Sequence, residues 1–484
     1  MNRETWDEGI HRIDDILVAE AAQAKRRRIK TWRWAGAAAA VVALVGLGAG
    51  LFLKPCNSQP PAAGSADGGT GGGTGGASGN YQRLAAAMAQ YPSAYEFEDY
   101  DTQRAIREEN PVEDSFLDSV RRFGYRTGSA LLAAGEENRL YSPISLYYAL
   151  ALAASGAEGE TQSQLFALLN VEDTATLERQ CSNLYRQMYT DHSVTKLRIA
   201  NSLWLDNQVN GQPVTYQQDY LDTAVQQYYA SLFSVDFSQQ DAAAAMARWV
   251  EDNTNGLLSR QEETDPQQML SILNTIYFYD EWIDRFDASK NTQDTFTLAD
   301  GKTVICEYMN RTYGSHGFSK GDGYTASSLG LKGAGSMVFI LPDEGVSTQE
   351  LLASPERLEQ ALNGGTEGYG KVVWQVPKFS FGSRIDLKQG LEALGVTDAF
   401  SRDCADFSGI TQTPAYLSSA RQDAHIAIDE NGVEAAAFTE LAYAGAGMPE
   451  DEAEMILNRP FLFAVTSNQG ALLFLGVCAD PTAS

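Results

Sequence analysis

The hydrophobic residues of this chain recur with two different periods, one typical of helices and one typical of strands. Residues 112–134 and 242–258 carry apolar side chains at helical spacing. Alternation of apolar and polar residues, which predicts strands, is commoner in the second half. The strands predicted in this way span residues 197–205, 269–279, 336–341 and 371–381. Helices that dominate one half and strands that dominate the other predict an α+β fold with large mixed sheets.

A separate apolar run near the N-terminus has the length of a membrane span. Residues 35–53 contain no charged side chain and, as a helix, would be about 28 Å long, close to the hydrocarbon thickness of a bilayer. Trp32, Trp34 and a basic cluster at 25–30 precede this run. By the positive-inside rule, the N-terminus is expected in the cytoplasm and the chain after residue 54 outside. A cleaved signal peptide is the alternative, but the hydrophilic lead is long for one, so we expect an uncleaved anchor.

These features divide the chain into four predicted parts. Residues 1–30 form a short cytoplasmic segment and 31–54 a transmembrane helix. Residues 55–79 are rich in Gly, Ser, Ala and Thr, cannot bury a core, and are expected to act as a flexible tether. Residues 80–484 have a globular composition throughout and form one large domain. The prediction is a single globular head held outside a cell membrane.

Composition excludes several classes of function. The net charge is −27, and this acidity argues against nucleic-acid binding, which needs a basic surface. The five cysteines are scattered without a Cys-x-x-Cys pair, which indicates isolated thiols, and no metal site is predicted. The chain has four histidines and no nucleophile elbow, phosphate loop or zinc-protease motif. We therefore expect no enzyme and no cofactor, although a catalytic triad could hide in any order along a chain.

The stretch after Gly432 combines the pattern of a strand with the composition of a loop. Alternation places small or uncharged residues on one face of the potential strand and both glutamates on the other. The first face carries Val433, Ala435, Ala437 and Thr439, and the second carries Glu434, Ala436, Phe438 and Glu440. The glycines and alanines that follow are poor strand formers. This combination predicts a segment with two alternative conformations.

Several motifs resemble those of the serpins. Residues 430–437 (ENGVEAAA) resemble the serpin hinge, and residues 458–461 with 472–476 are similar to the family's C-terminal strand pair. Other matching motifs follow in the family's order at 142–145, 156–161, 201–204, 249–256, 273–278, 337–342, 376–379, 394–400 and 406–408. Each motif alone is weak, but together they cover nearly the whole head. The resemblance implies an α+β serpin fold with three β-sheets, about eight or nine helices and an exposed reactive-centre loop.

The resemblance also implies a mechanism and its residues. A serpin is a suicide substrate for a serine protease, which cleaves the loop, forms a covalent acyl complex and is trapped when the loop inserts into the main sheet. The hinge positions are Glu430, Gly432, Val433, Glu434, Ala435, Ala436 and Ala437. The shutter and breach positions, which hold the central strands until they part, are Ser142, Ser145, Asn274, Gln422 and Trp282. Gln422 stands where the family usually has histidine, and Val433 where it usually has threonine.

The resemblance places the reactive bond 14 residues after Gly432, at Ala446–Gly447. Small residues there suit an elastase-like or subtilisin-like protease. The span from Ala446 to Asn458 is longer than is common in the family, so the cut could shift by two or three positions. A cut at Tyr443–Ala444 would instead suit a chymotrypsin-like enzyme.

Three functions remain open at this point. The first is a monomeric, membrane-anchored inhibitor of bacterial type, with one N-terminal membrane helix and a head that faces outward. The second is a non-inhibitory serpin fold that serves as a binding or adhesion protein on the cell surface. The third is an enzyme whose site carries no recognised motif. The first is our prediction.

Overall fold

A computed structural model describes residues 81–433 and 451–483 of this chain, apart from 134, 136, 259–263 and 334. All of them belong to the larger of the two units into which the chain divides, residues 75–484. Within the described ranges, no helix has both the length and the apolar character to cross a membrane. The predicted cytoplasmic segment, membrane helix and tether lie outside the described residues, as does the stretch 434–450.

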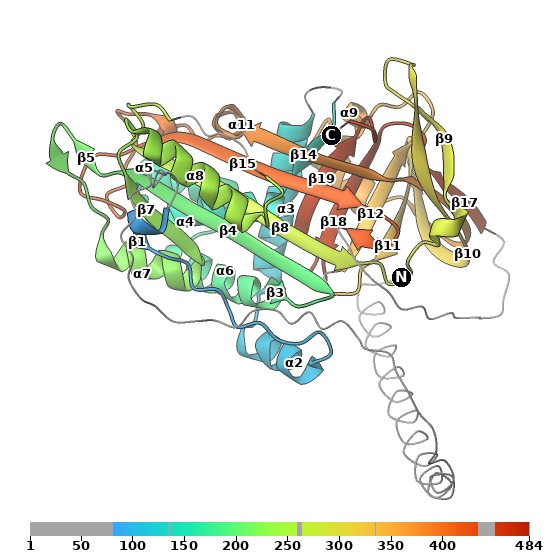
Figure 1. The fold of residues 1–484 in the computed structure, drawn as a ribbon, viewed down its shortest axis with the longest axis horizontal. Coiled ribbons are helices and arrows are strands. Elements are labelled where there is room, and N and C mark those ends of the chain that lie inside the picture. The colour runs from blue at the N-terminus through green and yellow to red at the C-terminus, as the bar shows by residue number, and fades with distance from the viewer. Residues whose placement is uncertain are drawn as a thin grey trace, which may run out of the picture. The chain divides into compact units, whose positions relative to one another are not determined.

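The main sheet combines strands from the whole length of the described chain (Figure 1). Its strand order is β1-β7-β4-β8-β16-β15-β14, and β3 also pairs with β4. In this order the strands are β1 (Ala85–Ala87), β7 (Ala230–Val235), β4 (Thr195–Asp206), β8 (Leu270–Glu281), β16 (Gly432–Val433), β15 (Leu417–Ile428) and β14 (Phe379–Asp386), with β3 at Thr190–Asp191. The sheet is mixed, because β8 and β15 are parallel whereas β4 is antiparallel to β8.

A second large sheet has the order β17-β13-β10-β11-β12-β18-β19-β2, and β9 pairs with β10. In this order the strands are β17 (Asp451–Ile456), β13 (Thr366–Pro377), β10 (Thr303–Gly321), β11 (Tyr324–Gly330), β12 (Gly335–Pro342), β18 (Phe461–Ser467), β19 (Leu472–Cys478) and β2 (Arg139–Tyr141), with β9 at Thr292–Thr297. A small hairpin of β5 (Gln208–Val209) and β6 (Gln212–Pro213) is the third sheet of the described part. The α+β class and the predicted three sheets are confirmed.

Ten α-helices lie in the described residues, against the eight or nine predicted. They are α2 (Tyr100–Glu109), α3 (Asp114–Leu132), α4 (Pro143–Ser155), α5 (Gly159–Leu169), α6 (Thr174–Met188), α7 (Gln218–Gln227), α8 (Gln240–Asn253), α9 (Thr348–Leu351), α10 (Pro355–Asn363) and α11 (Lys388–Ala393). The short 3-10 helices are η1 (Tyr81–Leu84), η2 (Ala288–Lys290) and η3 (Asp398–Phe400). Figure 1 shows α8 crossing one face of the main sheet, while α3, α4 and α6 lie behind it.

Helix α4 is the central element of the core. Its residues from 143 to 154 are all buried, so the helix is apolar all round, as expected of a helix enclosed by other elements. Ser142 caps its N-terminus, and Pro143 occupies the first turn, where a missing N–H costs nothing. The helix ends at Gly156, where an added Cβ would lie 2.2 Å from the Ile410 side chain. The N-terminal end of the helix lies against the main sheet, where Ser142 and Ser145 contact its strands.

One predicted strand proved to be two. Residues 371–381 alternate without interruption in the sequence, but β13 ends at Pro377 and β14 begins at Phe379. Lys378 leaves the ladder between them, and its N–H donates to the Glu307 carbonyl. The chain therefore passes from the second sheet to the main sheet at this residue, which places the Lys378 side chain beside the hinge.

Candidate functional site

The candidate site is the seam between β8 and β15 in the middle of the main sheet. At one end, Leu270–Thr275 of β8 pairs directly and in parallel with Leu417–Asp423 of β15. At the other end, the two-residue strand β16 stands between them. Val433 pairs with Asp280 of β8 and with Ile428 of β15, antiparallel to both. The seam therefore has an end closed by direct pairing and an end occupied by the first residues of the hinge.

The hinge enters the seam through a tight turn at residues 429–432. The Asp429 carboxylate accepts hydrogen bonds from the N–H groups of Asn431 at 2.7 Å and Gly432 at 3.3 Å, and the Asp429 N–H donates to the Gly432 carbonyl. A Cβ on Gly432 would lie 2.1 Å from the Asp280 carbonyl oxygen. Backbone atoms cannot move aside as a flexible side chain can, so this position requires glycine.

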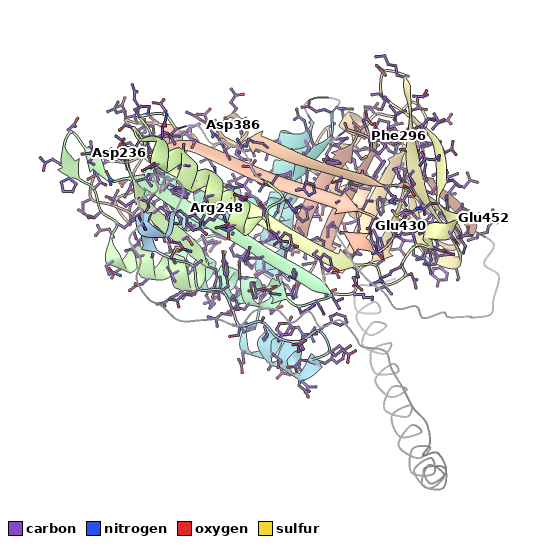
Figure 2. All side chains as sticks on the ribbon, viewed as in Figure 1. Asp236, Arg248, Phe296, Asp386, Glu430 and Glu452 are labelled. Atoms are coloured by element: carbon purple, nitrogen blue, oxygen red, sulfur yellow. The ribbon has the colours of Figure 1, made fainter. Side chains whose placement is uncertain are left out.

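Charged and polar side chains on the outside of this turn form a cluster, which we call the clasp. The Lys378 ammonium lies 2.9 Å from a Glu430 carboxylate oxygen and 3.3 Å from Glu307. The Asn291 amide also donates to Glu430, which lies where the main sheet meets the second sheet (Figure 2). Burial raises the pKa of Glu430, but hydrogen bonds from Lys378, the backbone and Asn291 outweigh that effect and leave its pKa below the ordinary value. Glu430 is therefore ionised at neutral pH and holds the hinge by charge.

Trp282 holds the same turn through two hydrogen bonds. Its backbone N–H donates to the Asn431 carbonyl and its indole N–H to the Asp429 carbonyl, both at 2.9 Å. The side chain is 1% exposed and packs edge-on against Phe286, whose N–H donates to the Glu430 carbonyl. Trp282 thus binds the turn at residues 429–431, where the chain enters the sheet.

A buried carboxylate lies directly opposite Val433. Asp280 is 0% exposed and accepts a hydrogen bond from the Thr195 hydroxyl at 2.7 Å. The Gly333 N–H donates to both of its oxygens at 3.2 Å, and the Glu281 N–H donates at 2.8 Å. Burial of a polar group is costly unless the group is hydrogen-bonded, as Asp280 is here. Asp280 therefore ties the end of β4, the loop before β12 and the hinge into one arrangement.

The closed end of the seam is held by a cluster of neutral polar side chains, which we call the lock. The Gln422 amide accepts from the Ser142 N–H at 2.6 Å and donates to both the Ser142 carbonyl and the Asn274 side chain at 2.9 Å. The Ser145 hydroxyl donates to the side-chain oxygen of Asn274 at 2.7 Å, and the Asn274 side-chain amide donates to the Ser145 backbone carbonyl at 2.8 Å. None of the four side chains is more than 2% exposed.

The structure thus brings together Ser142, Ser145, Asn274 and Gln422 at one end of the seam, and Glu430, Gly432, Val433 and Trp282 at the other. Glu434, Ala435, Ala436, Ala437, Ala446 and Gly447 lie outside the described residues, so their assignments stay predictions. Val433, on the predicted small-residue face, is 2% exposed.

Sequence reasoning missed several residues of the site. Asn201 accepts from the Asn274 amide at 2.5 Å and belongs to the lock. Lys378, Asp280 and Thr195 belong to the hinge end. The signal for Asn201 and Asp280 was a polar residue at an inward position of a buried strand. Lys378 lies in the motif at 376–379, but nothing in that motif indicates an ion pair with Glu430. Within the described part of the chain, no group of three or more His, Cys, Asp or Glu residues could hold a metal ion. The four cysteines found there, Cys181, Cys306, Cys404 and Cys478, are free thiols.

Comparison with known proteins identifies the fold and the family. The model of the family described as "Serpin (serine protease inhibitor)" matches residues 118–481. Alpha-1-antiproteinase S of Cavia porcellus is 30% identical over 356 residues, which cover 71% of this chain and 85% of that protein. An uncharacterized serpin-like protein of Methanosarcina acetivorans is 31% identical over 366 residues, 72% of this chain and 82% of that one. The solved structure of the thermophilic serpin tengpin in its native state matches with a TM-score of 0.69 at 25% identity, covering 83% of this chain and 99% of tengpin.

Proposed function

The chain belongs to the serpin family, whose members are in general inhibitors of serine proteases rather than enzymes, and we propose that it traps its protease by inserting residues 434 onward into the seam. The observation that carries this proposal is the position of β16. Val433 already pairs with both β8 and β15, and its direction points down the seam. A chain that continues in this register adds a central strand to the main sheet.

The register predicts which residues meet during insertion. Residue 433 pairs with residue 280 of β8 and residue 428 of β15, and it runs antiparallel to both strands. Each step forward along the inserting segment therefore moves one residue back along both strands, so that residue 434 would meet 279 and 427. Residue 438 reaches Thr275 and Asp423, where direct pairing of β8 and β15 begins. Insertion beyond that point must part the two strands. Thr439 would then take its place between Asn274 and Gln422, where its hydroxyl can both donate and accept.

The faces of the inserting segment fit this path. Val433, Ala435, Ala437 and Thr439 follow the inward side, and the glutamates follow the other. About ten residues that gain pairing on both sides, at roughly 1 kcal/mol net per hydrogen bond, would release on the order of 10 kcal/mol. A release of that size can offset distortion of a protease active site.

A matched pair of substitutions tests the inserted strand. Ala435→Arg would place a charge opposite the buried Phe278 and Ile426, whereas Ala436→Arg projects from the other face, opposite Tyr277 and His425. We expect Ala435→Arg to convert the inhibitor into a substrate that is cleaved without a complex, and Ala436→Arg to retain trapping. Gel electrophoresis under denaturing conditions after mixing with elastase or subtilisin separates the outcomes. Equal behaviour of the two variants would refute insertion in this register.

The proposed reactive bond is Ala446–Gly447. The protease serine oxygen would attack the Ala446 carbonyl, form an ester to it, and release the Gly447 amine as the new N-terminus of the C-terminal fragment. Mass spectrometry of that fragment reads the position directly. A fragment that begins at Ala444 would instead assign the cut to Tyr443 and favour a chymotrypsin-like target.

We also propose that the inhibitor is monomeric and is displayed on the outside of a bacterial cell by a single N-terminal membrane helix. The support is the uncharged run at 35–53, the basic cluster before it and the low-complexity tether after it. Detergent extraction and protease treatment of intact cells test the topology, since only the head should be digested. A non-inhibitory binding head is the alternative function. Nicking of the wild-type loop by every serine protease tried, with no covalent complex, would establish that alternative.

A further inference from the structure

A strap of residues 81–110 lies before the part of the chain that the family model matches, which begins at residue 118. It follows the edge of the main sheet and then turns toward the hinge end. Strand β1 pairs with β7, and the Ala89 N–H donates to the Ser231 hydroxyl at 3.1 Å. Tyr91 stacks on Tyr189, and helix α2 ends the strap against α6. The strap is therefore an ordered addition to the head.

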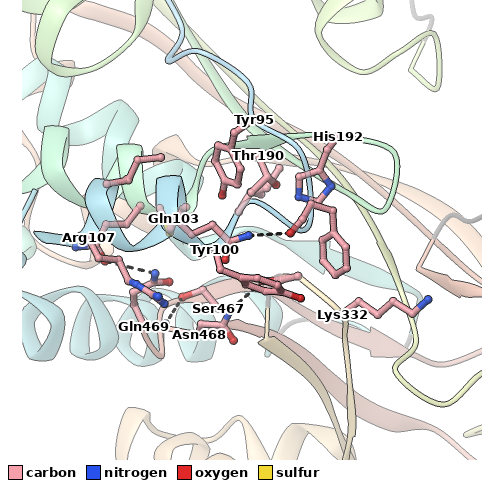
Figure 3. Close-up of a pocket in the computed structure, with 16 residues that line it drawn as sticks. Tyr95, Tyr100, Gln103, Arg107, Thr190, His192, Lys332, Ser467, Asn468 and Gln469 are labelled. Carbon is pink, nitrogen blue, oxygen red and sulfur yellow. Dashed lines mark hydrogen bonds between the residues drawn. The ribbon is translucent and has the colours of Figure 1, made fainter. Parts of the chain in front are cut away.

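A cavity of about 180 Å³, partly open to solvent, lies between the end of this strap and the body of the protein (Figure 3). We call it the strap pocket. The strap contributes aromatic side chains and Arg107. The body contributes the end of α6, the β3–β4 hairpin, the loop before β12 and the turn after β18. An engineered cavity of about 150 Å³ in another protein holds a benzene molecule, so the strap pocket has room for one ring with a small substituent.

The walls of the strap pocket combine aromatic rings with unused polar groups. Tyr95, Phe97 and Tyr100 line it, and Tyr100 is 65% exposed although its ring borders the cavity. The Thr190 hydroxyl is buried and has no hydrogen-bond partner among the described residues. His192 accepts the Thr195 N–H on its Nδ1 at 3.0 Å, so a neutral ring keeps its Nε2–H as a donor. A ligand that carries hydrogen-bond acceptors would satisfy these groups.

The charge of the strap pocket is opposite to that of the protein. The net charge of the chain is −27, yet the lining contains Arg107 and Lys332 and no Asp or Glu. Lys332 is already paired with Glu281 at 2.7 Å. Arg107 lies beside Gln469, across the pocket from Lys332, and has no ion-pair partner within the described ranges (Figure 3). A guanidinium left free at the edge of an aromatic pocket matches a carboxylate, which it can bind through two parallel hydrogen bonds.

We propose that the strap pocket binds a small monocyclic aromatic carboxylate, with the carboxylate on Arg107 and the ring among Tyr95, Phe97 and Tyr100. None of the contacts that support this site rests on protease trapping. The site is connected to the seam, because Gly333 lines the pocket and donates its N–H to Asp280 opposite Val433. Thr195 forms a second connection, since it bonds both His192 and Asp280. A ligand that holds the strap against these groups will stabilise the native arrangement of the hinge end.

Isothermal titration of the full chain with phenylacetate tests the site. We expect saturable binding, with phenylacetamide and 2-phenylethylammonium binding about tenfold more weakly or worse, because a charged hydrogen bond is lost or replaced by repulsion. Arg107→Gln should weaken phenylacetate binding by about tenfold. Arg104→Gln is the matched control, since Arg104 lies on the same helix, is exposed and pairs with Asp101 away from the pocket. It should leave the affinity unchanged.

A second variant separates the ring contact from the charge contact. Tyr100→Ala removes an exposed side chain, so the fold should persist while phenylacetate affinity falls. Absence of saturable heat up to about 10 mM phenylacetate would overturn the proposal. Equal affinity of phenylacetate and phenylacetamide, or an Arg107→Gln variant that binds like the wild type, would also overturn it.

Discussion

The two ends of the seam hold the same pair of strands by different means. At the hinge end, the contacts include ion pairs among partly exposed side chains, with Lys378 30% and Glu430 13% exposed. At the lock end, Ser142, Ser145, Asn274 and Gln422 are neutral and almost completely buried. Exposed ion pairs are screened by salt and weaken when either partner is neutralised. Buried neutral networks are insensitive to both, but removal of one member leaves the others unsatisfied.

This difference matches what the proposed insertion would require of each end. The hinge end would have to let further residues enter between β8 and β15, because Gly432 and Val433 already lie there. Under that proposal, the lock end would hold β8 and β15 together until an inserting strand brings groups that can replace the lost hydrogen bonds. On this proposal, resistance to separation of the two strands increases along the seam from the hinge end to the lock end. The following substitutions test that gradient from the strongest effect to the weakest.

Removal of the central side chain of the lock should have the largest effect. Asn274 accepts from Ser145 and Gln422 and donates to the Ser145 carbonyl and Asn201. Asn274→Ala leaves several buried donors and acceptors without partners, so we expect the free energy of unfolding to fall by about 2–4 kcal/mol. Urea unfolding followed by tryptophan fluorescence measures this change.

The matched control is Asn183→Ala, which removes an amide that makes one exposed hydrogen bond to the Pro111 carbonyl. We expect its free energy of unfolding to change by less than about 0.5 kcal/mol. If both variants unfolded at the same urea concentration, the lock would not be what holds the closed end.

An added methyl group at the hinge should have an intermediate effect. Gly432→Ala would place a Cβ 2.1 Å from the Asp280 carbonyl, so β16 must leave the seam or the seam must widen, at a cost of about 1–3 kcal/mol. Hydrogen exchange at the Val433 amide should become faster. Gly314→Ala is the control, because an added Cβ there meets nothing within 4 Å. Unchanged exchange in Gly432→Ala would mean that β16 is not confined by the strands beside it.

The sequence predicted the lock better than the clasp, for a physical reason. Ser142, Ser145 and Asn274 lie within the motifs at 142–145 and 273–278, and the family resemblance assigned Gln422 by its position alone. The clasp depends on the Lys378 side chain, which comes from a chain crossing between the two sheets and contacts Glu430 from 52 residues away. The apolar–polar alternation continues through Lys378 without a break. The single strand predicted at 371–381 therefore did not reveal that the chain passes from one sheet to the other at this residue.

The alternation of small and charged residues after Gly432 predicted which face of the strand is buried, but not which residues it contacts. It placed Val433 on the face that the structure buries. It could not show that Asp280 lies opposite, since the register between β16 and β8 is a tertiary property. The strap was harder still, because its polar residues have no strong period and are held by rings and edge pairing supplied by the body. Here tertiary contacts, not local propensity, determine the structure.

The smallest effect, and the sharpest distinction between the two ends, should come from Glu430→Gln. This change removes the charge that pairs with Lys378, and we expect a loss of about 1 kcal/mol at neutral pH. Lys371→Met is a control for a fully surface pair, since Lys371 and Glu452 are 48% and 68% exposed, and it should cost almost nothing.

The pH dependence of the Glu430→Gln effect follows from the direction of its pKa shift. Because the pKa of Glu430 is lowered in the folded protein, its stabilising contribution is complete above the ordinary glutamate value and disappears as pH falls through the lowered one. The difference in unfolding free energy between wild type and Glu430→Gln should therefore be constant near neutral pH, shrink in the acidic range below the ordinary value, and decrease with added salt. The difference between wild type and Asn274→Ala should show neither trend, because no member of the lock ionises. A lock that weakened with salt as the clasp does would remove the distinction between the two ends.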